Sequence, residues 1–407
     1  MQIRASFALV GLVLAACPTL VACGSDDVDT TPLPEDVLLA PPPEGQGVQY
    51  QMTTKLEPGT EAEHCKFVQA PAEGMFVNRD QVRFTKGSHH FLLYETPYTT
   101  IPTKTEDGAV IDTSGVFDCS EGATLNFAVT KLIAGSQNAD GDAFLNFPSD
   151  VAMPVEAGRV LLMNAHYINA TAEVMEPEVR VNLYTIPAEQ MKQEGDIMFW
   201  YNPFIKVGAK STGRAHMKCM IHADITLTNV QSHMHARGTG YAAALPGTDV
   251  FYTSEAWENV PVKRFDPGMK VTAGTWIDYY CDYNNAGAND VFQGPRSTDE
   301  MCMLIGSYYP ASKVTSNCAA DPENPGQTGN LGAEWVGNGT ETCAATMGCV
   351  QQLFSGTGDF LQGVTSCIDK ADPAVSKEMS DSLRCLFLNG QNASTACKAQ
   401  FDACSAK

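Results

Sequence analysis

Positively charged residues are scarce in this sequence. Lys and Arg number 26 against 47 Asp and Glu, so the formal net charge is −21 at pH 7. Nucleic-acid binding depends on Lys and Arg that neutralise phosphates, so this charge balance argues against a nucleic-acid partner. Long apolar runs are also scarce, because no stretch of 18 apolar residues follows the N-terminal region. We therefore expect no membrane-spanning helix in the rest of the chain.

Amphipathic helical patterns are scarce before about residue 340. The 34 Gly and 23 Pro interrupt segments rich in Thr, Val and Tyr, a texture typical of strands separated by turns. We therefore predict an all-β fold of two consecutive β-sandwich (jelly-roll-like) domains, over residues 48–186 and 187–320. A Gly-, Asn- and Pro-rich linker is expected over 321–340, followed by a small helical module over 341–407.

The N-terminus resembles the signal peptide of a bacterial lipoprotein. An apolar stretch, Phe7–Ala16, precedes Leu20-Val21-Ala22-Cys23, which resembles a lipobox, in which the Cys is lipidated after cleavage. We therefore expect a signal peptide over 1–22, lipidation of Cys23 and an acidic, Pro-rich tether over 23–47. The mature protein would be held at the bacterial cell envelope, with the lipid anchor as its only membrane contact.

Cysteine parity separates two candidate cleavage sites. Of the 14 Cys, setting aside Cys17 and Cys23 leaves 12, an even number suited to disulfide pairing. Cleavage at the second lipobox candidate, before Cys17, leaves 13 others. An ordinary signal peptide is the alternative to both. In each case the mature chain enters an oxidising compartment, where disulfides form.

The C-terminal module is rich in cysteine. Its six Cys are Cys343, Cys349, Cys367, Cys385, Cys397 and Cys404. A module this small lacks a large core, so we expect disulfides to stabilise it, although six Cys allow 15 connectivities and the sequence does not select one. A zinc site is the rival interpretation, but the spacings are not C-x₂-C and no His follows His235.

Histidine is rare, with eight residues in the whole chain, and five of them occur in informative contexts. His233 and His235 form an His-x-His pair, which on a strand would place both rings on one face, able to share one metal ion. His89 and His90 are neighbours, so on a strand they face oppositely. Their convergence needs a twist or bulge, or the use of different ring nitrogens, and His166 as a third contributor. Imidazole suits copper, zinc, iron and nickel alike.

The order of these motifs resembles one enzyme family. His89-His90, His166-Tyr167, His233-Met234-His235 and Asp299-Glu300-Met301-Cys302 follow one another as in the type II, ascorbate-dependent copper monooxygenases. That family includes peptidylglycine α-hydroxylating monooxygenase and dopamine β-monooxygenase. The resemblance covers roughly Cys65 to Cys318, and the Cys-rich C-terminal module falls outside it.

The resemblance implies two copper sites. His89, His90 and His166 would hold an electron-transfer copper; His233, His235 and Met301 would hold the copper that binds oxygen and carries out catalysis. A thioether such as that of Met301 favours Cu(I). The implied function is hydroxylation of a C–H bond in a small substrate with O₂ and an external reductant such as ascorbate. The family's cysteine pattern implies three disulfides: Cys65–Cys119, Cys219–Cys318 and Cys281–Cys302.

The resemblance also bears on the substrate. In the peptide-amidating relatives an Arg, an Asn and a Tyr anchor a terminal carboxylate, and the matching positions here are Gln231, Met303 and Ile305. Because Met and Ile offer no hydrogen-bond donor, we expect a neutral or hydrophobic substrate. The alternative is that the carboxylate anchor has moved to Arg237 or Lys263.

Two other classes of function stay open. A non-catalytic copper-binding or copper-storage lipoprotein on the same scaffold would need the same ligands, and a structural surface protein would need none of them. Three further histidines, His64, His216 and His222, have no counterpart in the family, so we expect surface or packing roles for them. Asn164, two residues before His166, is a candidate to hydrogen-bond near the site.

Overall fold

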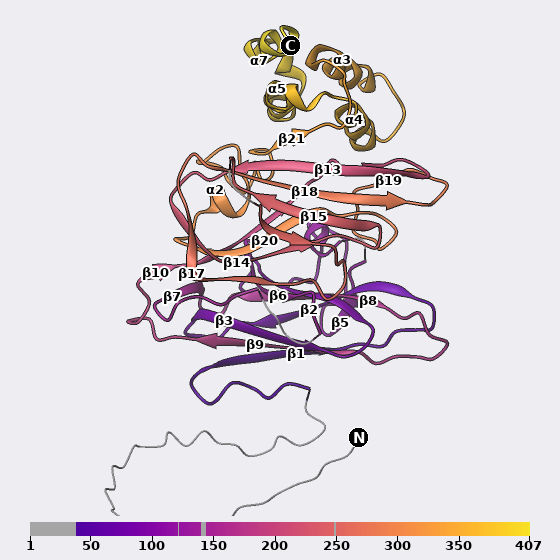
Figure 1. Cartoon of the computed structure of the whole chain (residues 1–407). Coiled ribbons are helices and arrows are strands. Elements are labelled where there is room, and N and C mark those ends of the chain that lie inside the picture. The colour runs from indigo at the N-terminus through magenta and orange to yellow at the C-terminus, as the bar shows by residue number, and fades with distance from the viewer. Residues whose placement is uncertain (1–37, 121, 140–143, 248–249) are drawn as a thin grey trace, which may run out of the picture. The chain divides into compact units, whose positions relative to one another are not determined.

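The computed structural model describes residues 38–120, 122–139, 144–247 and 250–407 (Figure 1). Residues 38–407 form one compact unit. The predicted signal peptide, the lipidation site Cys23 and the tether up to residue 37 lie outside the described residues. Within the described ranges, no helix is both long enough and apolar enough to cross a membrane.

Two five-stranded sheets are built from the first half of the chain. Sheet 1 contains, in spatial order, β1 (Gly47–Thr53), β9 (Glu178–Thr185), β3 (Met75–Phe84), β7 (Val151–Val155) and β10 (Gln193–Glu194). Sheet 2 contains β5 (Val116–Asp118), β2 (Glu61–Gln69), β8 (Val160–Ile168), β4 (Ser88–Glu95) and β6 (Lys131–Ser136). A short helix, α1 (Ala123–Asn126), lies between β5 and β6 in the chain.

Two further sheets follow. Sheet 3 contains β11 (Asp196–Tyr201), β20 (Met303–Tyr309), β14 (Ile225–His233) and β17 (Lys263–Val271). Sheet 4 contains β16 (Val250–Ser254), β15 (Gly238–Ala244), β18 (Trp276–Asn285), β13 (Ser211–Met220) and β21 (Glu334–Val336). A two-stranded ribbon pairs β12 (Lys206–Val207) with β19 (Val291–Phe292), and α2 (Lys313–Ser316) follows β20.

Strand burial distinguishes the outer sheets from the inner ones. Strand β18 alternates between buried and partly exposed residues over most of its length, the pattern of a strand with one face against a core. Strands β8 and β14 are instead buried at almost every position. Both faces of β8, in sheet 2, and of β14, in sheet 3, are therefore covered.

Two hydrophobic cores lie among these sheets. The first consists mainly of buried side chains from β1 to β9, and the second gathers side chains from β11 to β21 and from the C-terminal helices. Three residues of sheet 3, Ile197, Met303 and Ile305, belong to the first core. Sheet 3 therefore packs against both cores, and Figure 1 shows β14 and β20 between the strands of sheet 2 and those of sheet 4.

The prediction of a mostly β chain with a small helical, disulfide-linked C-terminal part is confirmed. The strands, however, form four sheets of four or five strands each. In the number and size of its sheets the fold is propeller-like, and the prediction of two consecutive sandwiches is not met. The physical reason is that sheet 3 shares side chains with the first core, so the sheets are packed as one series. A sequence pattern of alternating strands does not reveal which sheets share a core.

The C-terminal part is helical, as predicted. It contains α3 (Cys343–Leu353), α4 (Phe360–Asp369), α5 (Ser376–Asn389), α6 (Ala393–Ala396) and α7 (Lys398–Ser405), with 3₁₀ turns at Pro373–Val375 and Gly390–Asn392. Three disulfides join its cysteines, as Cys343–Cys404, Cys349–Cys367 and Cys385–Cys397. Asp359 caps α4 and Thr342 caps α3, each accepting a backbone N–H with its side chain.

The segment expected to be a linker, 321–340, contains strand β21. Trp335 in β21 is 1% exposed, and its backbone N–H donates to the Ser380 hydroxyl of α5 at 2.8 Å. Side chains of α3, α4 and α5, including Val350, Val364 and Leu383, belong to the second core. The segment expected to be a linker therefore includes a short strand, which a single buried Trp among Gly and Asn residues does not signal.

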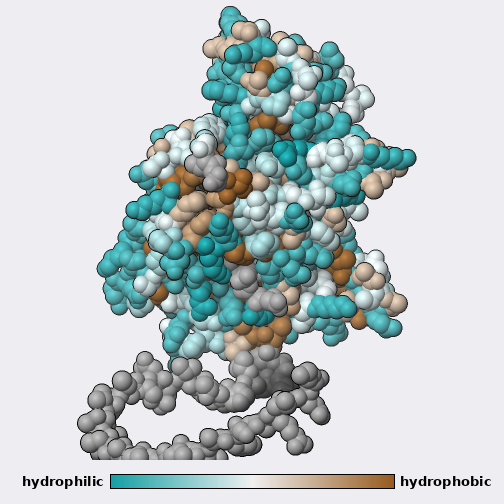
Figure 2. Space-filling view, in the orientation of Figure 1, coloured by the Kyte–Doolittle hydropathy of each residue, from teal (hydrophilic) through white to brown (hydrophobic). Residues whose placement is uncertain are grey.

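The surface in view is mostly polar. Figure 2 shows apolar residues in small separate patches. Large hydrophobic side chains that are exposed include Val110, Phe354 and Leu361, at 80%, 63% and 60%. Scattered residues of this kind are normal on soluble surfaces.

A buried carboxyl, Asp80, is expected to make stability depend on pH. Its oxygens accept the backbone N–H groups of Gly135 and Leu145 at 3.1 and 2.7 Å, yet burial raises the pKa of Asp80 to about 7. The folded state therefore retains a proton that the unfolded chain has released above about pH 4. From this group alone, the free energy of unfolding should fall by about 1.4 kcal/mol per pH unit between about pH 4 and 7.

Urea unfolding at pH 5 and pH 7.5 measures this effect. The wild-type protein should lose about 2–3 kcal/mol more than Asp80→Asn between these two pH values, because the amide does not titrate. An equal loss in both proteins would contradict the assignment to Asp80.

Candidate metal centre

Three histidines meet where strands β4 and β8 pair in sheet 2. His90 lies opposite His166 in the register, and a shift in the register between Ser88 and His90 interrupts regular pairing. This irregularity is what the tandem histidines need in order to converge. The candidate ligand atoms of His89, His90 and His166 all lie within 4.8 Å of one another, a separation that one metal ion can bridge.

The second histidine pair lies at the end of β14 in sheet 3. His233 is the last residue of the strand, and His235 lies two residues on, beyond the strand and just before a turn at 236–237. Their ring centroids are nevertheless 5.2 Å apart. The two rings are therefore close together although only His233 lies within the strand.

The two predicted ligand sets are adjacent. The His233 ring centroid lies 5.5 Å from that of His90 and 6.4 Å from that of His89. We call His89, His90, His166, His233 and His235 the five-histidine cluster. The sequence predicts two separate sites, whereas the structure brings all five rings into one cluster, because sheet 3 packs directly against the first core.

Burial lowers the pKa values of His89, His90, His233 and His235. Burial, together with the neighbouring His166 and His235, lowers the pKa of His89 to about 4. The same causes, burial first and neighbouring histidines second, hold the pKa values of His90 and His233 well below their usual range. A neutral imidazole has a free lone pair, which is the form that binds metal ions.

Several ring nitrogens of the cluster have no protein partner. His90 Nδ1, His166 Nδ1 and His235 Nε2 are buried and make no hydrogen bond among the described residues. Buried polar atoms are rarely left unpaired in folded proteins, so three unpaired ring nitrogens in one cluster favour a bound ligand. An all-imidazole donor set of this kind fits copper, and also zinc or iron.

The opposite ring nitrogens are held by the protein. His166 Nε2 is hydrogen-bonded to Glu61 Oε1 at 2.8 Å, and His235 Nδ1 to the carbonyl of Asp299 at 3.1 Å. His233 Nδ1 is 2.6 Å from Gln137 Oε1. Metal-binding histidines typically donate their second N–H in this way, which fixes the tautomer and the ring orientation. The residues present therefore fit a metal ion.

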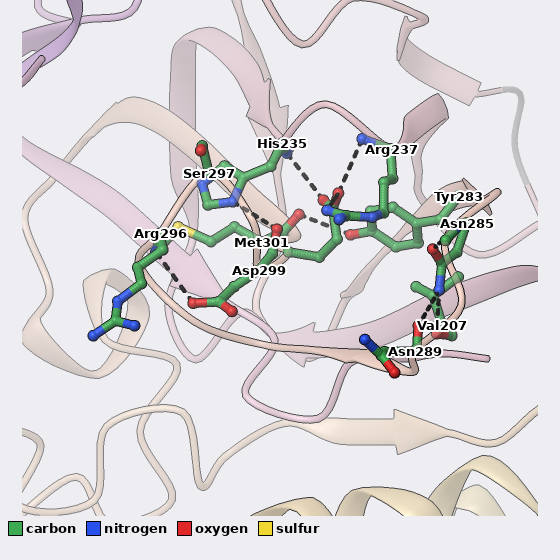
Figure 3. A network of polar contacts seen from close by, with 12 residues as sticks. Val207, His235, Arg237, Tyr283, Asn285, Asn289, Arg296, Ser297, Asp299 and Met301 are labelled. Atoms are coloured by element: carbon green, nitrogen blue, oxygen red, sulfur yellow. Dashed lines mark hydrogen bonds and ion pairs between the residues drawn. The ribbon is translucent and has the colours of Figure 1, made fainter. Parts of the chain in front are cut away.

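Met301 lies on the segment that leads into β20. Figure 3 shows it in one network with His235, Arg237, Ser297 and Asp299. Its carbonyl accepts the hydroxyl of Tyr283 at 2.7 Å, and its side chain packs against the first core. These contacts fix the backbone of Met301, and the role of its thioether stays a prediction.

The neighbouring Glu300 ties this segment to the His-x-His turn. It is fully buried, and its carboxylate accepts the backbone N–H groups of His235 and Arg237 at 3.1 and 3.0 Å. Burial raises the pKa of Glu300 to about 7, although these N–H groups and Arg237 lower it. Arg237, considered as an alternative carboxylate anchor, thus lies with its Nη1 3.7 Å from Glu300.

The predicted substrate-pocket residues are all buried. Gln231, Met303 and Ile305 are 0%, 5% and 2% exposed, and Gln231 pairs with Ile305 in sheet 3. Lys263, the other alternative anchor, donates to the carbonyl of Phe251 at 2.7 Å. A cavity of about 480 Å³ lies elsewhere, lined by Lys131 and Asp196 among others, and none of the five histidines lines it.

The three disulfides implied by the resemblance are present in the structure: Cys65–Cys119, Cys219–Cys318 and Cys281–Cys302. Asn164 donates to Glu63 Oε2 at 3.0 Å, and its amide nitrogen is 3.5 Å from the sulfur of Cys119. Cys302 adjoins Met301, so the bridge to Cys281 in β18 restrains that segment.

Sequence analysis missed several residues around the cluster. Glu61, Gln137 and Trp257 belong to none of the motifs, and no local pattern marks them; only their contacts identify them. Glu300 stands in the quoted Asp-Glu-Met-Cys motif, which is a signal that could have been used. Outside the cluster, His216 is hydrogen-bonded to Asp278 at 2.6 Å, which agrees with a structural role.

Trp257 should report metal binding. Its ring centroid is 5.6 Å from that of His89. A Cu(II) ion held by His89 would therefore quench the fluorescence of this indole strongly, and the other three Trp less. Titration of the protein with Cu(II) should remove part of the emission, and Trp257→Phe should lack that quenched part. Equal fractional quenching in both proteins would contradict this placement.

Comparison with known proteins leaves the family open. No protein-family model matches the chain, and no curated protein matches it. Among solved structures, a tail fiber protein from an E. coli phage has 10% sequence identity and a TM-score of 0.12. The match covers 64% of this chain and 35% of the fiber chain. A similarity of this size gives no information on fold or function.

Proposed function

We propose that this protein is a copper-dependent monooxygenase that hydroxylates a C–H bond of a small, neutral or hydrophobic substrate with O₂. The observation that carries the proposal is the five-histidine cluster, in which buried ring nitrogens lack protein partners. The order of motifs in the sequence, which resembles the type II copper monooxygenases, supports copper over zinc or iron. Copper bound there would supply electron acceptance and the activation of molecular oxygen.

Three histidines of the cluster have a defined part in this proposal. His166 would present Nδ1 to the metal while Glu61 holds its Nε2, and His235 would present Nε2 while the Asp299 carbonyl holds its Nδ1. His233 would likewise present Nε2, since Gln137 occupies its Nδ1. The chain thus presets ring orientations, so that little reorganisation is needed when a metal binds.

The division into two copper ions rests on the resemblance and on the two cores. His89, His90 and His166 come from strands of the first core, over the predicted unit 48–186. His233, His235 and Met301 come from the second unit, 187–320. Two ligand sets on two units support two ions, and their adjacency supports direct electron transfer between them. The same proposal includes an external reductant, which is ascorbate or another one-electron donor. It also includes lipidation of Cys23 and a location at the bacterial cell envelope.

Copper storage is the second candidate, because a specific observation favours it. Four of the five cluster histidines are at most 9% exposed, and the predicted pocket residues Gln231, Met303 and Ile305 are buried. Such burial leaves little room for a substrate beside the ligands, whereas a stored ion needs none. Oxygen consumption distinguishes the two candidates, since storage requires no turnover.

Metal analysis and oxygen uptake test the proposal. The reconstituted protein should hold two copper ions per chain and consume O₂ with ascorbate and a hydroxylatable substrate. His233→Ala and Met301→Ala should abolish hydroxylation while the site of His89, His90 and His166 still fills. At the site of His233, His235 and Met301, residual metal binding should persist after the Met substitution but not after the His substitution, because one thioether contributes less than an imidazole.

His222→Ala is the matched control, since His222 is exposed and lies outside the cluster. It should leave both copper content and oxygen uptake unchanged. A measured content of one copper per chain, or tighter binding of zinc than of copper, would contradict the two-ion proposal. Full copper loading without oxygen uptake would favour storage.

A glycine-extended peptide should be a poor substrate. A buried carboxylate needs charge-assisted hydrogen bonds, and the matching positions provide only the amide of Gln231, while Met303 and Ile305 provide none. An unpaired carboxylate would cost several kcal/mol, roughly a hundredfold or more in binding. Turnover of the peptide is compared with that of neutral aromatic and aliphatic compounds at equal copper and ascorbate. Efficient turnover of the peptide would overturn this account of the substrate but not the copper assignment.

A further inference from the structure

One carboxylate joins the two halves of the five-histidine cluster. Glu61 is the first residue of β2, in sheet 2, and its side chain is about one-third exposed. Its Oε1 is hydrogen-bonded to His166 Nε2 at 2.8 Å and also accepts the backbone N–H of Ser297 at 2.8 Å. Its Oε2 accepts the Ser297 hydroxyl at 2.7 Å. Glu61 and Ser297 are 236 residues apart in the chain.

The Ser297 turn leads directly to the second ligand set. Two residues further on, the carbonyl of Asp299 is hydrogen-bonded to His235 Nδ1, and Glu300 accepts the backbone N–H of His235. Met301 follows at once. Figure 3 shows Ser297, Asp299 and Met301 on one segment beside His235. An unbroken path of hydrogen bonds and short backbone therefore runs from His166 through Glu61 and Ser297 to His235.

We propose that Glu61 is a positioning residue that couples the two ligand sets, orienting His166 of the first set while holding the segment that carries Asp299 and Met301 of the second. This inference rests on the proposed metal site and deepens it. A metal ion at His89, His90 and His166 would fix His166, and through Glu61 it would steady the turn that orients His235. The two sets would then fill cooperatively, although no residue is shared between them.

The geometry requires a side chain of this length with two polar atoms at its end. The three donors approach from two different units, so both carboxylate oxygens are used. Gln can preserve all three contacts, because its Oε1 accepts from His166 and the Ser297 N–H, and its amide can donate to the Ser297 hydroxyl oxygen. Ala removes all three. Glu57, four residues earlier and paired only with Lys55 among the described ion pairs, provides a matched control.

The test uses the full chain with three variants and no substrate. In Glu61→Ala, ¹⁵N-NMR of labelled histidine should show loss of the Nε2–H tautomer of His166, and the Ser297 amide should exchange roughly tenfold faster. Affinity for Cu(II) should weaken by about 10–100-fold, the usual effect of losing the partner of a ligating His. Glu61→Gln should restore the tautomer and the amide protection, and Glu57→Ala should match the wild type throughout.

The outcomes separate this inference from the proposed activity. Either an unchanged His166 tautomer or unchanged Ser297 exchange in Glu61→Ala would overturn the coupling. If Glu61→Ala does not fold, Glu61→Asp decides, because the shorter carboxylate cannot reach both His166 and Ser297: loss of the His166 tautomer or of Ser297 protection supports the coupling, and retention of both refutes it. Absence of hydroxylation in the wild type would remove the proposed function and leave the NMR and exchange results standing.

Discussion

The packing of sheet 3 against the first core is the constraint on which the candidate site depends. The side chains of Ile197, Met303 and Ile305, in strands of sheet 3, pack among the buried side chains of the first half of the chain. Polar contacts reinforce this packing, since the Asn229 amide donates to the carbonyl of Phe144 at 3.0 Å and the Asn138 amide to that of Val260 at 2.9 Å. Because β8 and β14 are then covered on both faces, the histidines at their ends are brought together and withdrawn from water.

Burial of this kind determines the chemistry that the cluster can support. A charged imidazole is costly in such surroundings, so burial favours the neutral forms of His89, His90 and His233, whose lone pairs are then available. Each ring also needs a partner for its second nitrogen, and the chain provides a carboxylate, a backbone carbonyl and an amide from three different segments. The cluster is therefore specified by residues far apart in the chain as much as by its ligands.

This explains which features could be predicted from the sequence. The strands around Phe91 and Val160, the helix near Ser376 and the grouping of histidines by local motifs depend on nearby residues, and the structure contains them. The merging of the two histidine sets, the strand at Trp335 and the contacts of Glu61 depend on how sheets pack, and no local pattern encodes that. His235 illustrates both cases, since its place beside His233 follows from spacing while its position beyond the end of β14 does not.

The outer face of sheet 4 has a consequence for how this chain can evolve. Trp335 packs edge-on against Phe204 at 4.9 Å, and Phe204 stacks with Phe387 of α5 at 6.2 Å. A lineage that lost residues 341–407 would expose these rings and leave part of the second core uncovered. The helical segment 341–407 therefore cannot be gained or lost without changes elsewhere in the chain. Its gain or loss would have to be accompanied by polar replacements on β21 and its neighbours, and such paired changes should mark the branch on which it occurred.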